Sequence, residues 1–189
     1  LDVPVTEVIE AASTKPYGFM AFYPGPGVGG HCIPCDPHYL LWQLKALHVD
    51  AGVITEAMTR IAARPRRVVE RIRDVLGRAG KGTLGARVLV VGVTYKPDVA
   101  DLRESPALEI IDLLVDLGAE VQYVDTHAAH IHLGSGRERD SLADPAGFEP
   151  DVVLVHTRHH DSDLSWLDAD TVVVDGTYRS ADIAGRVLL

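Results

Sequence analysis

Residues 87–93 read Arg-Val-Leu-Val-Val-Gly-Val, a nearly continuous apolar run that predicts a strand buried on both faces of a parallel sheet. A helix is predicted to begin at Ser105-Pro106 and to end at Gly118, and a second strand follows over residues 120–124. This βαβ unit predicts an α/β fold with a small, Rossmann-like, doubly wound parallel sheet, completed by two further strands over residues 152–155 and 172–174.

The residues before this sheet follow a different pattern. An apolar stripe predicts a short helix over residues 4–13, and glycines and prolines predict a long loop over residues 14–37. Helical periodicity then dominates to residue 80, with a break or kink expected at Pro65. Because no strand precedes the first helix, we expect the chain to begin inside a domain. The expected parts are residues 1–36, the tail of that domain; residues 37–80, a central helical segment; and residues 81–189, the sheet domain.

The composition argues against several classes of protein. The 189 residues include 18 Lys and Arg against 27 Asp and Glu, a net charge of −9 that disfavours a nucleic-acid-binding surface. No apolar run approaches the roughly 20 residues of a membrane-spanning helix, and the amino terminus lacks the pattern of a secretory signal. We therefore expect a cytoplasmic protein that binds neither nucleic acid nor membrane.

Three glycines, Gly25, Gly27 and Gly30, fit the Gly-x-Gly-x-x-Gly pattern of dinucleotide-binding loops. That pattern holds a pyrophosphate only between a strand and a helix. Here an aromatic loop precedes the glycines and two prolines follow them. We instead expect the glycines of this loop to let the backbone pass close to a ligand or a catalytic side chain.

The octapeptide from His31 to His38 carries two thiols ahead of the long helical segment. The dipole and free amides of a helix N-terminus stabilise a thiolate, which makes Cys32 a candidate nucleophile. Asp36, one helical turn later, could activate a water molecule there. Three other interpretations stay open. Cys32 and Cys35 could be small buried hydrophobic residues, a dithiol redox pair, or ligands of zinc together with His127, His130 and His132.

In the sheet domain, the loop over residues 94–105 follows the first strand, where open α/β sheets bind ligands. Lys96 and Arg103 suit a phosphate or a carboxylate, although Arg103 could equally pair with Asp98 or Asp101. Arg179, after the last predicted strand, is a second candidate anion contact. Three histidines follow another strand, and we expect them to be partly exposed and not to bind a metal: His156, His159 and His160.

Two long motifs carry a family resemblance. They read Tyr23-Pro-Gly-Pro-Gly-Val-Gly-Gly-His-Cys-Ile-Pro-Cys-Asp-Pro37 and Gly92-Val-Thr-Tyr-Lys-Pro-Asp-Val-Ala-Asp-Leu-Arg-Glu-Ser-Pro106. Together they resemble the UDP-glucose/GDP-mannose dehydrogenase family, in order and over nearly all of the chain. The loop containing His31 looks more like the branch of UDP-N-acetylglucosamine and UDP-N-acetylmannosamine 6-dehydrogenases than like the UDP-glucose enzymes.

The resemblance implies an NAD-dependent oxidation of the C6 alcohol of a UDP-sugar to a carboxylate, in polysaccharide precursor synthesis. Cys32 matches the family's nucleophile, which passes through a thiohemiacetal and a thioester. Asp36 matches the aspartate that assists hydrolysis, and Arg103 matches an arginine on the NAD side of the cleft, where Cys32 also lies. The residues implied in substrate binding are Tyr23, Gly25, Gly27, Gly29, Tyr95, Lys96 and Arg179.

The resemblance also implies a homodimer and a further, NAD-binding domain. Family members are commonly homodimers, here through residues 37–80, and their amino-terminal NAD-binding domain is absent from this chain. We therefore expect the chain alone to turn over poorly. Cys35 replaces a residue that is not usually cysteine in the family and could form an inactivating disulfide with Cys32. Two alternatives stay open: a non-catalytic UDP-binding or dimerisation module, and a dithiol redox protein that uses both cysteines.

Overall fold

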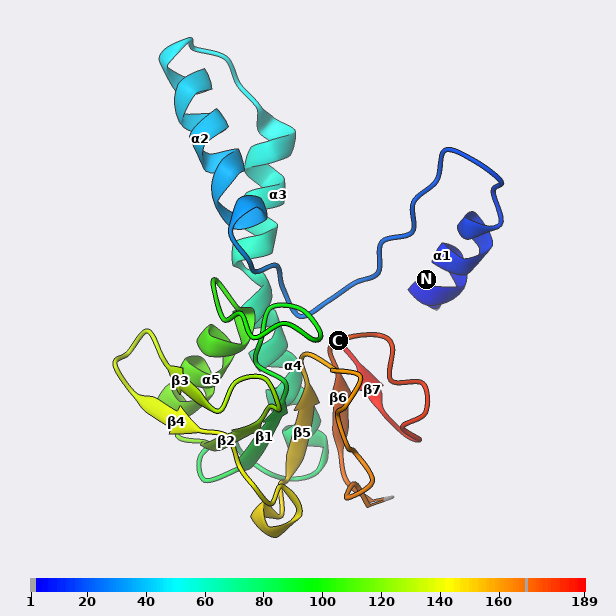
Figure 1. Cartoon of the computed structure of the whole chain (residues 1–189), viewed down its shortest axis with the longest axis vertical. Coiled ribbons are helices and arrows are strands. Elements are labelled where there is room, and N and C mark those ends of the chain that lie inside the picture. Colours follow the sequence, from blue (N-terminus) through cyan, green and yellow to red (C-terminus); the bar gives the residue numbers. More distant parts are fainter. Residues whose placement is uncertain (1–2, 169) are drawn as a thin grey trace.

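A five-stranded parallel sheet forms the body of the molecule in the computed structural model, which describes residues 3–168 and 170–189 (Figure 1). The strand order is β2-β1-β5-β6-β7, and every neighbouring pair is parallel. The predicted α/β fold is confirmed, with the last predicted strand beginning one residue later. The strands are β1 (Arg87–Val91), β2 (Glu120–Val124), β5 (Val152–Val155), β6 (Val173–Asp175) and β7 (Val187–Leu188).

The chain changes direction across the sheet between β1 and β5. From β1 it passes through α5 (Pro106–Asp116) to β2 on one side, and β5, β6 and β7 then add on the other side. Gly92, directly after β1, has a φ of 72°, and a Cβ there would lie 1.8 Å from the carbonyl oxygen of Thr157. Only glycine lets the loops after β1 and β5 approach so closely. In doubly wound sheets, ligands bind at such a switch point, beyond the carboxyl ends of the strands.

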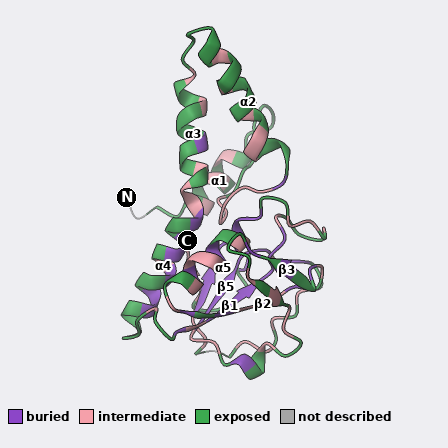
Figure 2. Cartoon of the chain, turned by 90° about the vertical axis from the view of Figure 1, so that its left-hand side faces the viewer, coloured by how far each residue is buried: buried purple, intermediate pink, exposed green. Residues whose placement is uncertain are grey.

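Helices cover one face of the sheet. Helix α4 (Arg64–Arg78) buries the apolar stripe that its sequence predicts, and this stripe joins α5 and the sheet in one core. Each fully buried aliphatic side chain of this core contributes roughly 1.5–3 kcal/mol. Irregular segments and a short 3-10 helix (Ala146–Phe148) cover the other face, where Phe148 packs on Leu89 and Val153. Figure 2 shows that the strands of the sheet are buried, whereas the helices that project above the sheet are mostly exposed.

Four helices precede the sheet: α1 (Val5–Ser13), α2 (Cys32–Ala46), α3 (Gly52–Ala62) and α4. The break predicted at Pro65 is confirmed, because α3 ends at Ala62 and Pro65 lies in the first turn of α4, where its missing amide costs no hydrogen bond. The loop predicted to run to residue 37 was too long. Helix α2 begins at Cys32. Pro34 is its third residue, where an amide would have no partner within the helix. Pro37 lies inside the helix and removes one hydrogen bond.

Helices α2 and α3 form a hairpin that projects from the body of the molecule (Figure 1). Its large apolar side chains are exposed in this single chain: Ile33, Tyr39, Leu40, Trp42, Leu47, Val49 and Val53. Among the described residues, no helix is both long enough and apolar enough to cross a membrane.

A small antiparallel ribbon lies beside β2 and was not predicted. It consists of β3 (His130–His132) and β4 (Glu138–Asp140), with His130 opposite Asp140 and His132 opposite Glu138.

Candidate functional site

A cavity of about 530 Å3 lies at the switch point of the sheet. Four segments far apart in the sequence line it: the glycine loop, and the loops that follow β1, β5 and β6. Six of the seven residues expected to bind substrate lie along it, namely Tyr23, Gly25, Gly27, Tyr95, Lys96 and Arg179. The fold therefore brings these residues together, while their contact with a substrate stays a prediction.

Two cations, Lys96 and Arg179, line this cavity. The Lys96 ammonium lies 5.4 Å from the centre of the Tyr95 ring, and the Arg179 guanidinium lies 5.4 Å from that of Tyr23. Neither forms a salt bridge with any residue that the structure describes. Arg158, also in the cavity, differs because its guanidinium binds both carboxylate oxygens of Asp182, at 2.5 and 2.7 Å. Two unpaired cations held over aromatic rings suit an anionic ligand.

The glycine loop packs tightly against the sheet domain. A Cβ at Gly29 would lie 2.6 Å from Cβ of Tyr95 and 2.7 Å from the carbonyl oxygen of Glu104, and one at Gly27 would lie 2.6 Å from Cγ of Pro106. Both glycines therefore let the loop pack closely on the sheet domain, while an approach to a ligand or a catalytic side chain stays a prediction. At Gly25 the nearest atom would be 3.8 Å away, so packing does not require glycine there.

The glycine loop does not have the dinucleotide-binding arrangement. Residues 14–31 contain no strand, although α2 begins two residues after Gly30. The loop is instead held from the side, since Arg64 of α4 donates a hydrogen bond from Nε to the carbonyl oxygen of Gly25 at 2.9 Å. The described residues thus lack the strand that a pyrophosphate-binding fingerprint requires before its glycines.

Cys32 is the first residue of α2 and is exposed, and Cys35 follows one turn later, half-buried. Both are free thiols. His31 caps the helix without a side-chain hydrogen bond, so the first amides of the helix face outward beside the Cys32 thiol. Asp36 is exposed and lies four residues after Cys32, which places both side chains on one face of the helix.

Arg103 lies close to this thiol. Its Nε and terminal nitrogen bind the carboxylate of Asp101 at 3.1 and 2.6 Å, so it pairs with Asp101 and not with Asp98. These hydrogen bonds lower the pKa of Asp101 to about 2. The pKa of Arg103 is raised, first by its hydrogen bond to Asp101 and further by the charges of Tyr95 and Cys32. Arg103 is thus already paired with Asp101, as Arg158 is with Asp182.

The prediction of three partly exposed histidines was wrong for two of them, because His156 and His159 are buried and only His160 is exposed. His159 joins two loops: its Nδ1 accepts the amide of Asp98 at 2.8 Å, and its Nε2 lies 3.2 Å from Oδ1 of Asp125. Each histidine follows a fully buried strand closely. No local pattern in the sequence reveals their burial, because it depends on the close approach of the loops after β1 and β5.

His156 lines the cavity and was missed as a candidate. Burial lowers its pKa to about 4, which keeps the ring neutral near pH 7. Its Nε2 has no hydrogen-bond partner among the described residues. A neutral imidazole with a free nitrogen can hydrogen-bond a polar group of a ligand.

The zinc interpretation finds no support in the described residues, because no converging group of possible ligands contains a cysteine. One such group, Asp98, His127 and His159, lies near the cavity. Both ring nitrogens of His159 are already engaged, with Asp98 and with Asp125. This group therefore holds the loops together without a metal.

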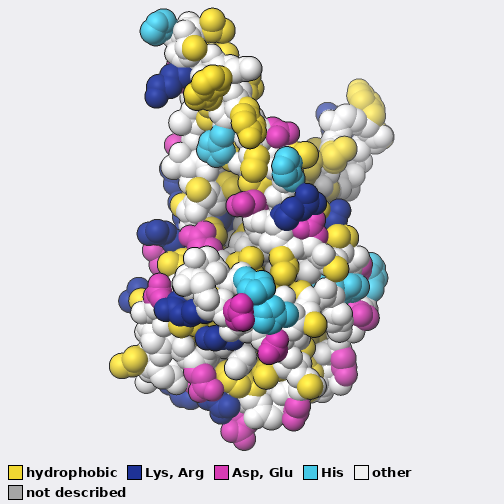
Figure 3. All heavy atoms as spheres, turned by 60° about the vertical axis from the view of Figure 1, so that its left-hand side comes forward, with side chains coloured by type: hydrophobic (Ala, Val, Ile, Leu, Met, Phe, Trp, Pro, Cys, Tyr) yellow, Lys and Arg dark blue, Asp and Glu magenta, His cyan; other side chains and the backbone are white. Residues whose placement is uncertain are grey.

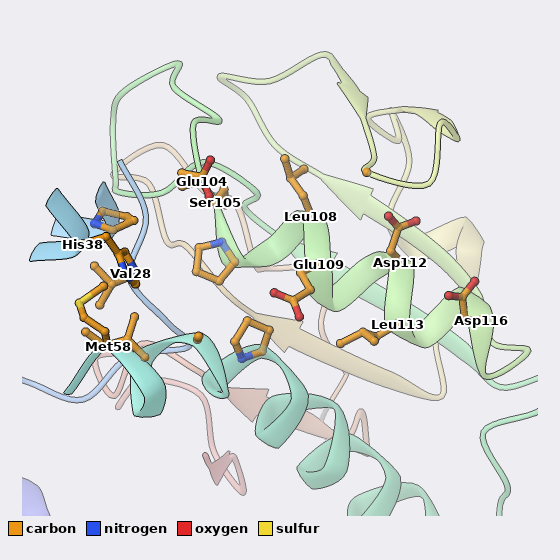
Figure 4. Close-up of a pocket in the computed structure, with 16 residues that line it drawn as sticks. Val28, His38, Met58, Glu104, Ser105, Leu108, Glu109, Asp112, Leu113 and Asp116 are labelled. Carbon is orange, nitrogen blue, oxygen red and sulfur yellow. The ribbon is translucent and has the colours of Figure 1, made fainter. Parts of the chain in front are cut away.

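A second cavity, of about 560 Å3, lies between α2–α4 and α5 (Figure 4). Val28, Met58 and Leu108 contribute apolar side chains, but the α5 side carries the carboxylates of Glu109, Asp112 and Asp116. Arg137 pairs with Asp112 and Asp116, but no lysine or arginine is among the described residues that line this cavity and could attract a diphosphate. Of the two cavities, the one with Lys96 and Arg179 is the better anion site.

Comparison with known proteins agrees with this geometry. The model of the family's central domain matches residues 1–61, and that of its UDP-binding domain matches residues 89–179. The chain belongs to the UDP-glucose/GDP-mannose dehydrogenase family. A UDP-N-acetyl-D-mannosamine dehydrogenase of Campylobacter jejuni is 34% identical over 163 residues, which cover 84% of this chain and 38% of the relative.

Solved structures in the family show the same fold. A UDP-N-acetyl-D-mannosamine dehydrogenase from Pyrococcus horikoshii superposes with a TM-score of 0.80 at 25% identity, covering 98% of this chain and 43% of that one. A UDP-glucose dehydrogenase from Pyrobaculum islandicum gives a TM-score of 0.76 at 28% identity, with 96% and 42% covered. The chain thus spans about two fifths of the length of these relatives.

Proposed function

We propose that this chain supplies the nucleotide-sugar cavity and the nucleophile of an NAD-dependent dehydrogenase that oxidises C6 of a UDP-N-acetylhexosamine to a carboxylate. The proposal rests on the cavity at the switch point. Its lining includes Lys96, Arg179 and the glycine loop that leads to Cys32. Several relatives bear the name UDP-N-acetyl-D-mannosamine dehydrogenase, which favours an N-acetylhexosamine as the sugar.

In the proposed complex, Lys96 and Arg179 bind the diphosphate of the UDP-sugar. Lysine acts as a point charge and arginine as a planar donor, and both remain available because no carboxylate neutralises them among the described residues. Gly27 and Gly29 keep the loop backbone flat against Pro106 and Tyr95, so its amides can face the ligand. The sugar then extends from the cavity toward Cys32.

The chemistry of the chain's own residues centres on Cys32. Its thiolate attacks the C6 aldehyde to form a thiohemiacetal, whose oxidation leaves a thioester on the sulfur. Asp36, on the same helix face, orients the water that hydrolyses the thioester and accepts its proton. NAD, when bound, would supply the hydride acceptor for both oxidations, of the alcohol to the aldehyde and of the thiohemiacetal to the thioester.

The described residues fit NAD only in part. Arg103 and Cys32 are exposed on the side where a dinucleotide could reach the sulfur, and Arg103 could bind a phosphate or ribose of NAD. No described strand feeds a glycine turn and helix of the kind that holds a pyrophosphate. The principal NAD contacts therefore have to come from outside these residues, and the chain alone should not turn over efficiently.

The proposal is tested by complementation. The amino-terminal domain of the Campylobacter jejuni relative is added as a separate chain, and NADH absorbance is followed with a UDP-N-acetylhexosamine. Turnover that depends on both chains supports the proposal, and Cys32→Ser should abolish it. UDP binding in calorimetry without any turnover would favour the non-catalytic binding module. Loss of activity in Cys35→Ser as complete as in Cys32→Ser would favour the dithiol alternative.

The hairpin of α2 and α3 has an apolar surface that a second copy of this chain could cover. Helices α2 and α3 expose large apolar side chains, with Trp42 at 74% and Val53 at 86% exposure, and surfaces of this kind mark interfaces. We propose that a second copy of this chain covers them. Light scattering should give a dimer that Trp42→Glu converts to a monomer, while Leu84→Glu, at an exposed apolar residue outside the hairpin, leaves it intact.

A further inference from the structure

The exposed face of the β3–β4 ribbon gathers two imidazoles and two carboxylates. His130 and His132 are two residues apart on β3 and so project from the same face. Their cross-strand partners, Asp140 and Glu138, carry the carboxylates. In Figure 3, histidine side chains lie beside acidic ones on the face where this ribbon comes forward. None of these four residues lines the nucleotide cavity.

Asp140 fixes the protonation pattern of His130. The two groups are 2.7 Å apart, between Nδ1 of the imidazole and Oδ1 of the carboxylate. An ionised carboxylate only accepts hydrogen bonds, so Nδ1 carries the proton and donates it. The neutral ring then has its lone pair on Nε2. A carboxylate behind a histidine in this way is the usual outer support of a metal-binding imidazole.

The remaining donors converge on the free side of His130. Its Nε2 is 3.9 Å from Oε2 of Glu138, and Nδ1 of His132 is 2.9 Å from Oε1 of the same carboxylate. The two rings stand edge to face with centres 4.7 Å apart. One ligand atom from each of the three residues lies within 4.8 Å of the others. In a tetrahedral zinc site the ligand atoms lie about 3.4 Å from one another. The three side chains are exposed, so small rotations can bring their ligand atoms to that spacing.

We propose that the ribbon binds one divalent transition-metal ion through His130 Nε2, His132 Nδ1 and the carboxylate of Glu138, with Asp140 as the positioning residue. Two imidazoles and one carboxylate suit Zn²⁺, Ni²⁺ or Cu²⁺, whereas Ca²⁺ and Mg²⁺ require mostly oxygen donors. Water completes the coordination on the exposed side. Because the ligands come from both strands, the ion clamps β3 to β4. The proposal is independent of the proposed dehydrogenase function.

The test uses the full chain without an affinity tag and with Cys32→Ser and Cys35→Ser, so that the thiols cannot hold zinc. Calorimetric titration with zinc chloride should show one equivalent bound. His132→Ala and Glu138→Gln should remove this binding, and Asp140→Asn should weaken it about 10- to 100-fold. His48→Asn, at an exposed histidine between α2 and α3, is the matched control and should bind as the parent does.

A second readout locates the ion. Paramagnetic Co²⁺ should broaden the amide signals of residues 130–140 and leave those of the loop over residues 92–98 sharp. Absence of zinc binding, or equal binding by His132→Ala and the parent, would overturn the proposal. Broadening centred on His127 and His159 would also overturn it, since the ion would then occupy the other histidine group. Circular dichroism of each variant shows that any loss of binding is not a loss of folding.

Discussion

The amide of Gly30 donates a hydrogen bond to the carbonyl oxygen of Arg103, over 2.8 Å. This bond joins the glycine loop to the loop that follows β1, and so connects the two motifs that carry the family resemblance. Cys32 begins α2 only two residues later. The position of the thiol relative to the cavity at the switch point is therefore set by a backbone contact, supported by the tight packing of Gly29 on Tyr95.

Gly29→Ala tests this docking. The added methyl group would overlap Cβ of Tyr95 and the carbonyl oxygen of Glu104, at 2.6 and 2.7 Å, so the loop has to move. We expect unfolding in urea to show a loss of about 1–3 kcal/mol and calorimetry to show weaker UDP binding. Gly82→Ala, with nothing within 4 Å of its Cβ position, should stay within about 0.5 kcal/mol of the parent. Equal stability of both variants would show that the loop is not held at Gly29.

Lys96→Ala and Arg179→Ala test the anion site. Each removes one charge-assisted contact to the proposed diphosphate, and we expect each to weaken UDP binding about 10- to 100-fold. Added salt should weaken binding by the parent more than by either variant. Lys81→Ala removes a surface lysine that pairs with Asp151, away from the cavity, and should bind UDP normally. Unchanged affinity in both cavity variants would place UDP elsewhere.

His156→Leu tests the buried imidazole. Its pKa is lowered to about 4 in the folded protein from a normal value of 6.5, so below pH 6.5 the unfolded chain binds a proton that the folded chain does not. Stability therefore falls as the pH drops, by about 2 kcal/mol between pH 7 and pH 5 from this residue. Between these two pH values, the free energy of unfolding in urea should decrease by about 2 kcal/mol less in His156→Leu than in the parent. The same pH dependence in parent and variant would contradict a neutral, buried His156.

The sequence predicts the elements whose pattern is local. The apolar run of β1 and the buried stripe of α4 appear as expected, because burial on two faces or along one helix face leaves a clear period. The prediction missed the short edge strand β7 at residues 187–188, the start of α2 and the ribbon. Helix α2 begins at Cys32, although Pro34 argues for a loop when the tolerance of first turns for proline is not considered. The ribbon strand Glu-Arg-Asp at residues 138–140 has no apolar alternation at all.

Six of the residues that line the cavity were predicted to lie together, but their geometry was not predicted. The carboxyl ends of parallel strands place Lys96 and Arg179 at the same edge of the sheet, and this follows from topology alone. The burial of His156 and His159 depends on the approach of the loops after β1 and β5, which no local pattern reveals. From the sequence alone, Arg103 could equally bind an anion or pair with Asp98 or Asp101. The fold places the carboxylate of Asp101 beside it.

The proposed role of Cys32 is tested most directly by mass spectrometry of the trapped intermediate. The chain, combined with the amino-terminal domain of a relative, is mixed with NAD and a UDP-N-acetylhexosamine, quenched in acid during turnover and digested. We predict a peptide in which the Cys32 sulfur carries the oxidised sugar nucleotide, accumulating further in Asp36→Asn because hydrolysis slows. An adduct on Cys35 alone, or full turnover by Cys32→Ser, would contradict the account.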